Sequence, residues 1–331
     1  MVGVVGINML KLVIIGTSWI TERFVRAALD TNKFELYGVY SRNKDSAQAF
    51  ADKFSTSRIY TDLEQVALSE ADCIYVASPN SYHAPQTMLM LEAGKHVVVE
   101  KPMASTAALA QQMFEVAEKN NAVLFEAYMS EYLPNFQVLR DNLSKLGKIR
   151  KANINYCQYS SRYQKYLDGE NPNTFNPDFS NGSIMDIGFY CVSATVALFG
   201  EPLSLKANAV KLASGVDGHG SVIFNYGEFD VVVTHSKVND SFLASEIQGE
   251  ASSLQVDMIA LCNTVTLHQR DQAPQNLSVD QHSNPMYYEA LKFAERVNQG
   301  EINPQDKQRS LIVSKLLTEI RRQTGVVFPA D

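Results

Sequence analysis

The chain has 331 residues, of which 45% are apolar and 20% are charged, so it can bury a large core and divide into about two domains. Its net charge of −7, with no block of Lys and Arg, argues against a nucleic-acid or acidic-membrane partner, because either requires a positive field. The four cysteines lie far apart without a CxxC pair, which predicts reduced thiols and a cytoplasmic protein.

The N-terminal stretch 1–15 is apolar enough to suggest a signal peptide, but it has no basic n-region and Lys11 interrupts it. A strand over 12–15 that enters a glycine turn explains the pattern better. Met9 is a candidate natural start, which would make residues 1–8 an extension. Nothing else approaches the ~18 uninterrupted apolar residues that a membrane helix needs.

The first third of the chain alternates between strand and helix. Strands are predicted at 12–15, 36–40, 73–77, 97–99 and 123–125. The helices between them are expected to end near residue 30 and to span 46–54, 85–93 and 107–120. This alternation predicts an α/β domain at 1–128 that contains a doubly wound parallel sheet.

The turn after the first strand fits a dinucleotide-binding loop only in part. Of the G-x-G-x-x-G/A pattern, Gly16 remains, while Ser18 stands at the second glycine and Thr21 at the third. Ser18 can still admit a phosphate to the N-terminus of the next helix and donate its hydroxyl to it. The motif is weak alone. It predicts cofactor contacts from Gly16, Thr17, Ser18, Trp19 and Ile20.

The end of the second strand indicates which cofactor binds. Ser41 and Arg42 stand where an acidic residue would bind a ribose 2′-hydroxyl. A carboxylate there would repel a 2′-phosphate, whereas Arg42 can hold it bidentately and stack on adenine. We therefore expect NADP, with NAD also possible. The alternative is that Arg42 is an ordinary surface arginine.

Within the stretch 93–102, a buried strand that ends on Lys101 is predicted. The three valines at 97–99 suit a strand covered on both faces, and Pro102 has no N–H to continue a ladder. The carboxyl ends of strands in open α/β sheets face the ligand crevice, so Lys101 would point at the ligand. A solvated lysine at a strand end is the alternative.

Several motifs resemble the Gfo/Idh/MocA family of NAD(P)-dependent oxidoreductases. They are Ala-Ser-Pro-Asn at 77–80 followed by His83, Ala-Gly-Lys-His at 93–96 and Glu-Lys-Pro at 100–102, with a further match near residue 186. The resemblance therefore covers nearly the whole chain.

The resemblance implies a position for each matching residue. Lys101 would lie by the nicotinamide and the substrate hydroxyl, and Asn80 and His83 would line the nicotinamide ribose. A structural histidine is the alternative for His83. With no other histidine at ligand spacing, we expect no metal site. The remaining expected cofactor contacts are Ser78, Pro79 and Glu100.

A helix is predicted over 181–200, ending at Gly200 before a proline. Asp186 and Tyr190 are four apart and would project from one face. The form Asp-Ile-Gly-x-Tyr resembles the branch that contains glucose–fructose oxidoreductase and dimeric dihydrodiol dehydrogenase, in which this tyrosine is the expected proton donor. A core tyrosine hydrogen-bonded to an aspartate is the alternative.

The second half, 129–331, is expected to be an α+β domain. A helix over 134–146 would bridge the domains, and the polar loop 160–179 would cover the cleft, its tyrosines serving equally well as packing residues. Short alternating runs predict a large, mostly antiparallel open sheet with one face on the Asp186 helix. An apolar outer face would form a homodimer or tetramer, as in much of the family. The expected strands are 152–159, 205–210, 221–225, 230–234, 244–248, 253–256 and 265–267, and the closing helices are 284–299 and 305–323.

These features together predict hydride transfer between nicotinamide and the CH–OH or carbonyl carbon of a sugar, polyol or vicinal diol. Burial and the positive oxidised nicotinamide would lower the pKa of Lys101 from ~10.4 toward ~7–8. Tyr190 would exchange the proton, with Lys101 lowering its pKa and Asp186 orienting Lys101 or binding a substrate hydroxyl. Lys101 as the direct acid or base is the alternative mechanism. A nucleotide sensor of the same fold without turnover is the rival function.

Overall fold

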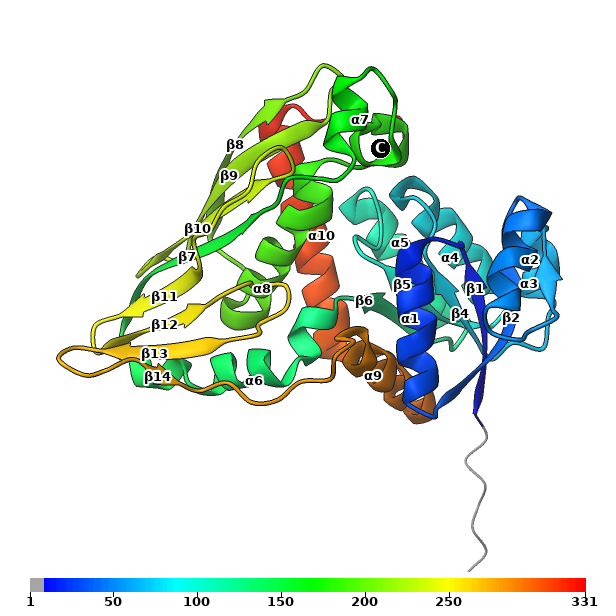
Figure 1. Cartoon of the computed structure of the whole chain (residues 1–331), viewed down its shortest axis with the longest axis horizontal. Helices are drawn as coiled ribbons and strands as arrows, with labels where there is room; N and C mark the ends of the chain where they lie inside the picture. The colour runs from blue at the N-terminus through cyan, green and yellow to red at the C-terminus, as the bar shows by residue number, and fades with distance from the viewer. Residues whose placement is uncertain (1–8) are drawn as a thin grey trace, which may run out of the picture.

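The structure, a computed structural model, describes residues 9–331, so the expected extension at 1–8 lies outside the described residues. Two β-sheets organise the molecule, one in each half of the chain (Figure 1). The division of the chain after residue 128 stays a prediction.

The N-terminal half contains a six-stranded parallel sheet with helices on both faces, which confirms the predicted doubly wound fold. Its strand order is β3-β2-β1-β4-β5-β6: the first three strands are added toward one edge and the last three toward the other, so the strand order reverses between β1 and β4. Open α/β sheets bind ligands at such a reversal. The strands are β1 (Leu10–Ile15), β2 (Phe34–Tyr40), β3 (Ile59–Tyr60), β4 (Cys73–Val76), β5 (His96–Glu100) and β6 (Leu124–Ala127). The helices are α1 (Trp19–Asp30), α2 (Lys44–Asp52), α3 (Leu63–Ala67), α4 (His83–Glu92) and α5 (Ala107–Lys119).

The second half contains an eight-stranded sheet in the order β14-β13-β12-β11-β7-β10-β9-β8. Every neighbouring pair is antiparallel except β7 and β10, which run parallel. The carboxyl ends of β7 and β10 therefore lie at the same edge. The strands are β7 (Ile149–Cys157), β8 (Ser204–Lys211), β9 (Asp217–Asn225), β10 (Asp230–Ser236), β11 (Ser245–Gly249), β12 (Ser252–Val256), β13 (Val265–Gln269) and β14 (Gln275–Asn276).

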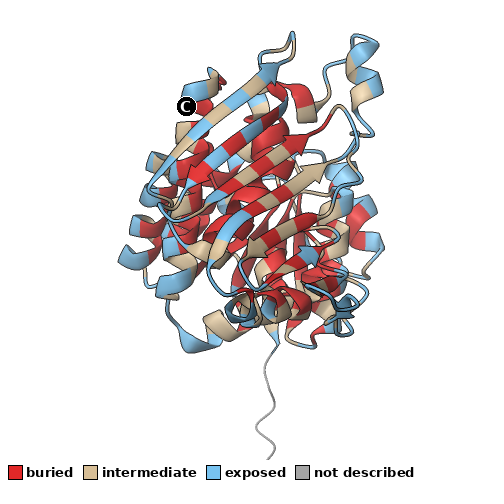
Figure 2. Ribbon diagram, turned by 90° about the vertical axis from the view of Figure 1, so that its left-hand side faces the viewer, coloured by how far each residue is buried: buried red, intermediate tan, exposed pale blue. Residues whose placement is uncertain are grey.

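The two faces of this sheet differ in polarity. Val222 and Phe224 of β9 point into the core, where the sheet packs on α8 (Phe189–Phe199), as predicted. Ser221 and Ile223 point to the other side, and Figure 2 shows the alternation of buried and exposed residues along the strands. The outer face is mostly polar, with Val210 and Ile223 as its exposed large apolar side chains.

The segment before α8 departs from the predicted regular helix. Residues Ile184–Gly188 form a π-helix, and the α-helix begins at Phe189 and is capped by Gly200. Single π-turns inside helices occur frequently at functional sites. The longer span Pro177–Phe199 is apolar enough to cross a membrane by length and composition, but 72% of its apolar window is buried within the fold. It is therefore the core helix of the second half.

The predicted bridging helix over 134–146 was wrong in its extent and its role. Helix α6 (Pro134–Asp141) is shorter than predicted, a 3₁₀ turn follows over Leu143–Leu146, and α6 packs against β13. Helix α10 (Pro304–Thr324) instead contacts α5 and β6 on one side and α8 and β8 on the other (Figure 1). Helix α9 (Met286–Gln299) packs on α1.

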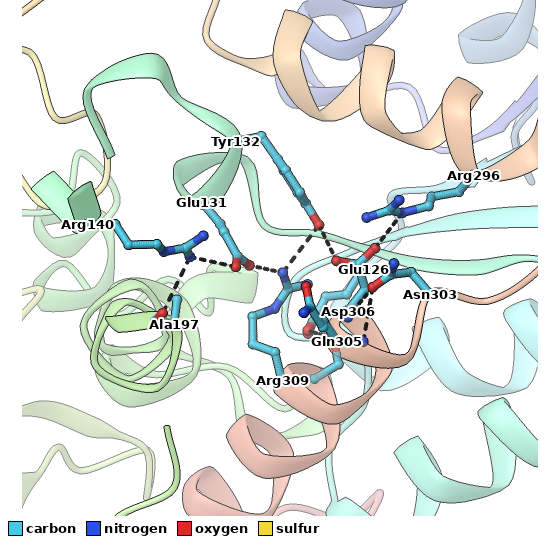
Figure 3. A network of polar contacts seen from close by, with 11 residues as sticks. Glu126, Glu131, Tyr132, Arg140, Ala197, Arg296, Asn303, Gln305, Asp306 and Arg309 are labelled. Carbon is cyan, nitrogen blue, oxygen red and sulfur yellow. Dashed lines mark hydrogen bonds and ion pairs between the residues drawn. The ribbon is translucent and has the colours of Figure 1, made fainter. Parts of the chain in front are cut away.

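A buried polar network holds α10 to the segment that leaves β6 (Figure 3). Arg309 of α10 forms an ion pair with Glu131, which also accepts a hydrogen bond from Arg140 at 2.8 Å. The hydroxyl of Tyr132 donates to Asp306 at 3.1 Å. Buried charges are tolerated only when they are paired in this way. The network therefore fixes how the chain crosses from the first sheet to the second.

Candidate active site

Three adjoining cavities lie along the carboxyl edge of the parallel sheet. The loop cavity, of about 350 Å³, is lined by Gly16, Ser18, Arg42 and Tyr82. The lysine cavity, of about 530 Å³, is lined by Lys101, Asp186, Tyr190 and Glu289, and the polar cavity, of about 770 Å³, by Arg162, Asn173, Asp186 and Lys237. All three share Ala77 and Ser78, which directly follow β4.

The loop cavity has the features that a dinucleotide pyrophosphate requires. Gly16 adopts φ +113°, and a Cβ on it would lie 2.6 Å from the carbonyl oxygen of Ala77, so this turn needs glycine. Ser18 is the N-cap residue of α1, and no side chain caps the first N–H groups of that helix. Uncapped N–H groups at a helix N-terminus favour an anion. These residues fit the phosphates of a dinucleotide.

Arg42 extends from the end of β2 into the same cavity. Its guanidinium carbon lies 5.6 Å from the ring centroid of Tyr82, and no carboxylate among residues 9–331 pairs with it. Ser41 and Thr17 also line this cavity. An unpaired guanidinium at this position can bind a phosphate bidentately.

Lys101 is enclosed by protein, with only 12% of its side chain exposed, so it is not a solvated lysine. Its Nζ donates to Asp186 Oδ1 at 2.8 Å and to the Asp186 carbonyl at 3.1 Å. The same Nζ lies 4.7 Å from the ring centroid of Tyr190. Helix residues from the second half thus meet the end of β5, and the three predicted catalytic residues lie together.

Glu100 is buried beneath this group and accepts a hydrogen bond from the hydroxyl of Tyr75 at 2.5 Å. Its other oxygen accepts from the backbone N–H of Lys101 at 3.3 Å. Glu100 therefore supports the end of the strand while lining the lysine cavity.

Lys237 is a charged residue at the site that the sequence analysis did not identify. It directly follows β10, has 5% of its side chain exposed, and forms an ion pair with Asp186 Oδ2. Asp186 therefore lies between two lysines, Lys101 and Lys237. The parallel pairing of β10 with β7 brings Lys237 to the cleft edge.

Three pKa shifts define the charges of this group. Burial acts to raise the pKa of Asp186, but Lys101 and Lys237 outweigh it and hold that pKa well below its usual range. Burial acts to lower the pKa of Lys101, but Asp186, Tyr190 and Glu100 raise it above its usual value. The expectation of a pKa near 7–8 for Lys101 was therefore wrong for this structure, because the carboxylate of Asp186 stabilises the ammonium. Burial raises the pKa of Tyr190, with Lys101 opposing the shift, so Tyr190 holds its proton.

His83 occupies a bracing position between two loops. Its Nδ1 lies 2.9 Å from the carbonyl oxygen of Pro102, and its Nε2 lies 2.7 Å from that of Ser78. Burial lowers the pKa of His83, although its contacts with the two carbonyl oxygens act in the opposite direction. This is the structural alternative that the sequence left open. Asn80 donates to the carbonyl of Ser180 at 3.0 Å, and cofactor contacts from both residues stay predictions.

The segment 160–179 lines the polar cavity, although it is not the irregular loop that was predicted. It contains α7 (Tyr163–Leu167) and two 3₁₀ turns. Tyr163 and Tyr166 pack on Phe175 with ring centroids 5.5 and 5.3 Å apart, so these tyrosines are packing residues. Apart from Pro172, its cavity-lining side chains are polar or charged, among them Arg162, Lys165, Asn171, Asn173 and Thr174.

Trp19 and Glu289 both border the lysine cavity, but Trp19 is exposed to solvent whereas Glu289 is buried. Trp19 is 68% exposed, and with Ile20 it borders both the lysine and polar cavities. Glu289 of α9 is 1% exposed, and neither carboxyl oxygen has a hydrogen-bond partner. The sequence analysis did not identify Glu289. Within residues 9–331, no group of three His, Cys, Asp or Glu side chains could hold a metal ion.

Comparison with known proteins agrees with this architecture. Residues 10–128 match the model of an oxidoreductase family with an NAD-binding Rossmann fold, and residues 142–255 match the GFO/IDH/MocA C-terminal domain. Uncharacterized oxidoreductase YgjR of Escherichia coli is 54% identical over 98% of this chain and 99% of that protein. The scyllo-inositol 2-dehydrogenase (NADP(+)) IolU of Bacillus subtilis is 41% identical over 98% of this chain and 99% of its own length.

More distant relatives share the fold over nearly the whole chain. The trans-1,2-dihydrobenzene-1,2-diol dehydrogenase of Mus musculus is 26% identical over 93% of this chain and 94% of its own length. The solved structure of KijD10, a 3-ketoreductase of Actinomadura kijaniata in complex with NADP and TDP-benzene, superposes with a TM-score of 0.87. It is 21% identical and covers 97% of this chain and 99% of its own. The chain therefore belongs to the Gfo/Idh/MocA family and is an NAD(P)-dependent oxidoreductase.

Proposed function

We propose that this enzyme transfers a hydride between NADP and the CH–OH or carbonyl carbon of a polyol, sugar or vicinal diol, with Tyr190 as the proton-transferring residue. The observation that carries the proposal is the position of Tyr190 beside Lys101, which is itself bound to Asp186. Hydride transfer at a carbinol carbon requires a proton to leave or reach the oxygen, and Tyr190 keeps a proton for that purpose.

The bound nicotinamide supplies the hydride acceptor or donor. During reduction Tyr190 gives its proton to the carbonyl oxygen and is left as a tyrosinate beside the Lys101 ammonium, and solvent then returns a proton to it. During oxidation Tyr190 first loses its proton to solvent, and the tyrosinate then takes the proton of the alcohol. Lys101 stays an ammonium and stabilises the negative charge that develops on either oxygen. Asp186 fixes Lys101 in place, and Lys237 fixes Asp186. The ion pair with Asp186 opposes the alternative in which Lys101 itself loses the proton.

A preference for NADP over NAD is supported by Arg42. Its unpaired guanidinium borders the loop cavity at the end of β2, where a ribose 2′-phosphate would lie. The relative that is 41% identical is named as an NADP(+) enzyme. We infer the same preference for this chain.

A polyhydroxy substrate is supported by the lining of the polar cavity. Asparagine and glutamine side chains with charged groups surround it, and such groups both donate to and accept from hydroxyls. The names of IolU and of the mouse relative specify an inositol and a diol. We infer that the substrate is a polyol, sugar or diol of that kind, or the matching carbonyl compound.

The association of subunits through the second sheet is a further part of the proposal. The outer face is mostly polar rather than apolar, with Val210 and Ile223 exposed on it, so the inference of a homodimer or tetramer through this sheet rests on the family resemblance. All four cysteines are free thiols, as a cytoplasmic location would require.

Trp19, the only tryptophan, provides the test because it borders both the lysine and polar cavities. Titration with NADPH and with NADH should quench its fluorescence, with NADPH binding more tightly. A screen of inositols, sugars and vicinal diols with NADP⁺ should then reveal NADPH formation. Absence of binding to either cofactor would refute the proposal. Tight binding without turnover of any compound in the screen would favour the sensor instead.

A further inference from the structure

The carboxyl group of Glu289 has no function in the mechanism above, yet it is placed at the reacting cavity. It lies in the first turn of α9, is 1% exposed and borders the lysine cavity together with Lys101 and Tyr190. Both oxygens are buried without a hydrogen-bond partner. A buried carboxyl without partners is costly when ionised, so it is retained in the neutral form unless a positive charge comes near.

The groups around Glu289 come from three elements. Glu100 and Lys101 face it from the end of β5, Arg23 from α1 and Tyr75 from β4. The Nε of Arg23 donates a hydrogen bond to the side-chain amide oxygen of Asn284 at 3.4 Å. Burial, followed by the nearby Glu100, raises the pKa of Glu289 well above its usual value, whereas Arg23 and Lys101 oppose the shift too weakly.

Glu100 and Glu289 therefore differ in what they can do. Glu100 has both oxygens occupied, by the hydroxyl of Tyr75 and the N–H of Lys101. Glu289 has neither occupied, so its charge depends on what the cavity contains. The lysine cavity follows the ends of β4, β5 and β6, beyond the loop cavity that fits the phosphates, so a dinucleotide would place its nicotinamide there.

We propose that Glu289 is the counter-charge of the nicotinamide: it is neutral when the ring is reduced and loses its proton when the ring carries the positive charge of the oxidised form. This inference rests on the proposed function, because it requires nicotinamide in the lysine cavity. Binding of NADP⁺ expels the Glu289 proton to solvent. When the ring accepts a hydride and becomes neutral, Glu289 takes up a proton again, so charge and protons balance over the cycle.

Calorimetry of cofactor binding in buffers of different ionisation enthalpy tests the proposal by counting protons. NADP⁺ binding should release up to about one proton more than NADPH binding near neutral pH, the difference that a single titrating group produces. The 2′-phosphate is common to both cofactors and cancels in the comparison. Glu289→Gln should abolish this difference in proton release and weaken the binding of NADP⁺ relative to that of NADPH on the order of tenfold. Equal proton counts for the two cofactors in the wild type would overturn the proposal.

Lys101→Met separates Glu289 from Lys101, and Glu100→Gln separates it from Glu100, a second buried carboxyl of the lysine cavity whose pKa burial also raises. A difference that persists in Glu289→Gln but disappears in Lys101→Met or in Glu100→Gln would overturn the proposal. If Glu289→Gln does not fold, infrared difference spectra of the wild type replace it. The C=O band of a protonated carboxyl should disappear on NADP⁺ binding and remain on NADPH binding. A band that NADP⁺ leaves unchanged would overturn the proposal. Failure of the proposed function would look different, since neither cofactor would then quench Trp19.

Discussion

Replacing Asp186 by asparagine should destabilise the protein because it leaves two enclosed lysines without their shared counter-charge. In the native structure the carboxylate receives Lys101 on one oxygen and Lys237 on the other. The amide of asparagine keeps the shape but removes the charge. The two ammonium groups, 12% and 5% exposed, would then face each other in the same cleft.

The expected loss of stability follows from the exposure of the group. Removing one partner of a fully buried ion pair costs about 3–5 kcal/mol. The side chain of Asp186 is 34% exposed to the cleft, so water screens part of this cost, and we expect about 2 kcal/mol. With an unfolding entropy of about 0.7 kcal/mol/K for a chain of this size, the melting temperature should fall by about 3 °C.

Thermal unfolding at two pH values tests this reasoning. In Asp186→Asn, Lys101 loses the carboxylate that raises its pKa, and burial then lowers that pKa below the unfolded value. The folded state therefore binds fewer protons than the unfolded state, and stability rises with pH. The deficit relative to the wild type should therefore shrink between about pH 7 and 9. The double variant Asp186→Asn/Lys237→Met, which removes one excess charge, should be more stable than the single variant. A single variant as stable as the wild type at both pH values would refute the reasoning.

Two further substitutions test other parts of the account. Arg42→Ala should weaken the binding of NADPH about tenfold or more and leave the binding of NADH unchanged, because only NADPH has the 2′-phosphate. Quenching of Trp19 fluorescence measures both affinities. Equal weakening of NADPH and NADH binding would contradict the assignment of Arg42. Arg309→Met removes the buried partner of Glu131 and should cost about 3–5 kcal/mol in denaturant unfolding, whereas the exposed control Arg322→Met should leave the midpoint unchanged; equal effects would contradict the role of the network in Figure 3.

The sequence predicted the parallel sheet well because its strands are continuous apolar runs. Val97, Val98 and Val99 are fully buried, as their β-branched pattern indicates. The convergence of Lys101, Asp186 and Tyr190 was expected from the resemblance rather than from spacing. The π-helix at Ile184–Gly188 was not predictable, since no residue pattern distinguishes it from an ordinary helix start.

Lys237 and Glu289 were missed for two separate physical reasons. The strands of the second half were expected to be antiparallel, but β7 and β10 pair in parallel, and this pairing places Lys237 at the cleft. Which strands become neighbours depends on the tertiary fold, so the alternation of apolar and polar residues within each strand does not predict it. Glu289 was expected to lie in a helix, but which side of that helix would be buried was not predicted. The spacing of Met286, Ala290 and Phe293 defines the buried stripe of α9, and Glu289 falls within it, so the signal was present in the sequence.

In the proposed mechanism, Tyr190 transfers the proton while Lys101 stays charged. The most direct measurement compares turnover of the wild type and Tyr190→Phe with NADP⁺ and scyllo-inositol, or the best substrate from the screen, with the carbonyl product identified by mass spectrometry. Tyr190→Phe should bind NADPH normally and lose about 10²–10⁴-fold in turnover, the usual contribution of a positioned acid or base. Near-full turnover in Tyr190→Phe would contradict the account.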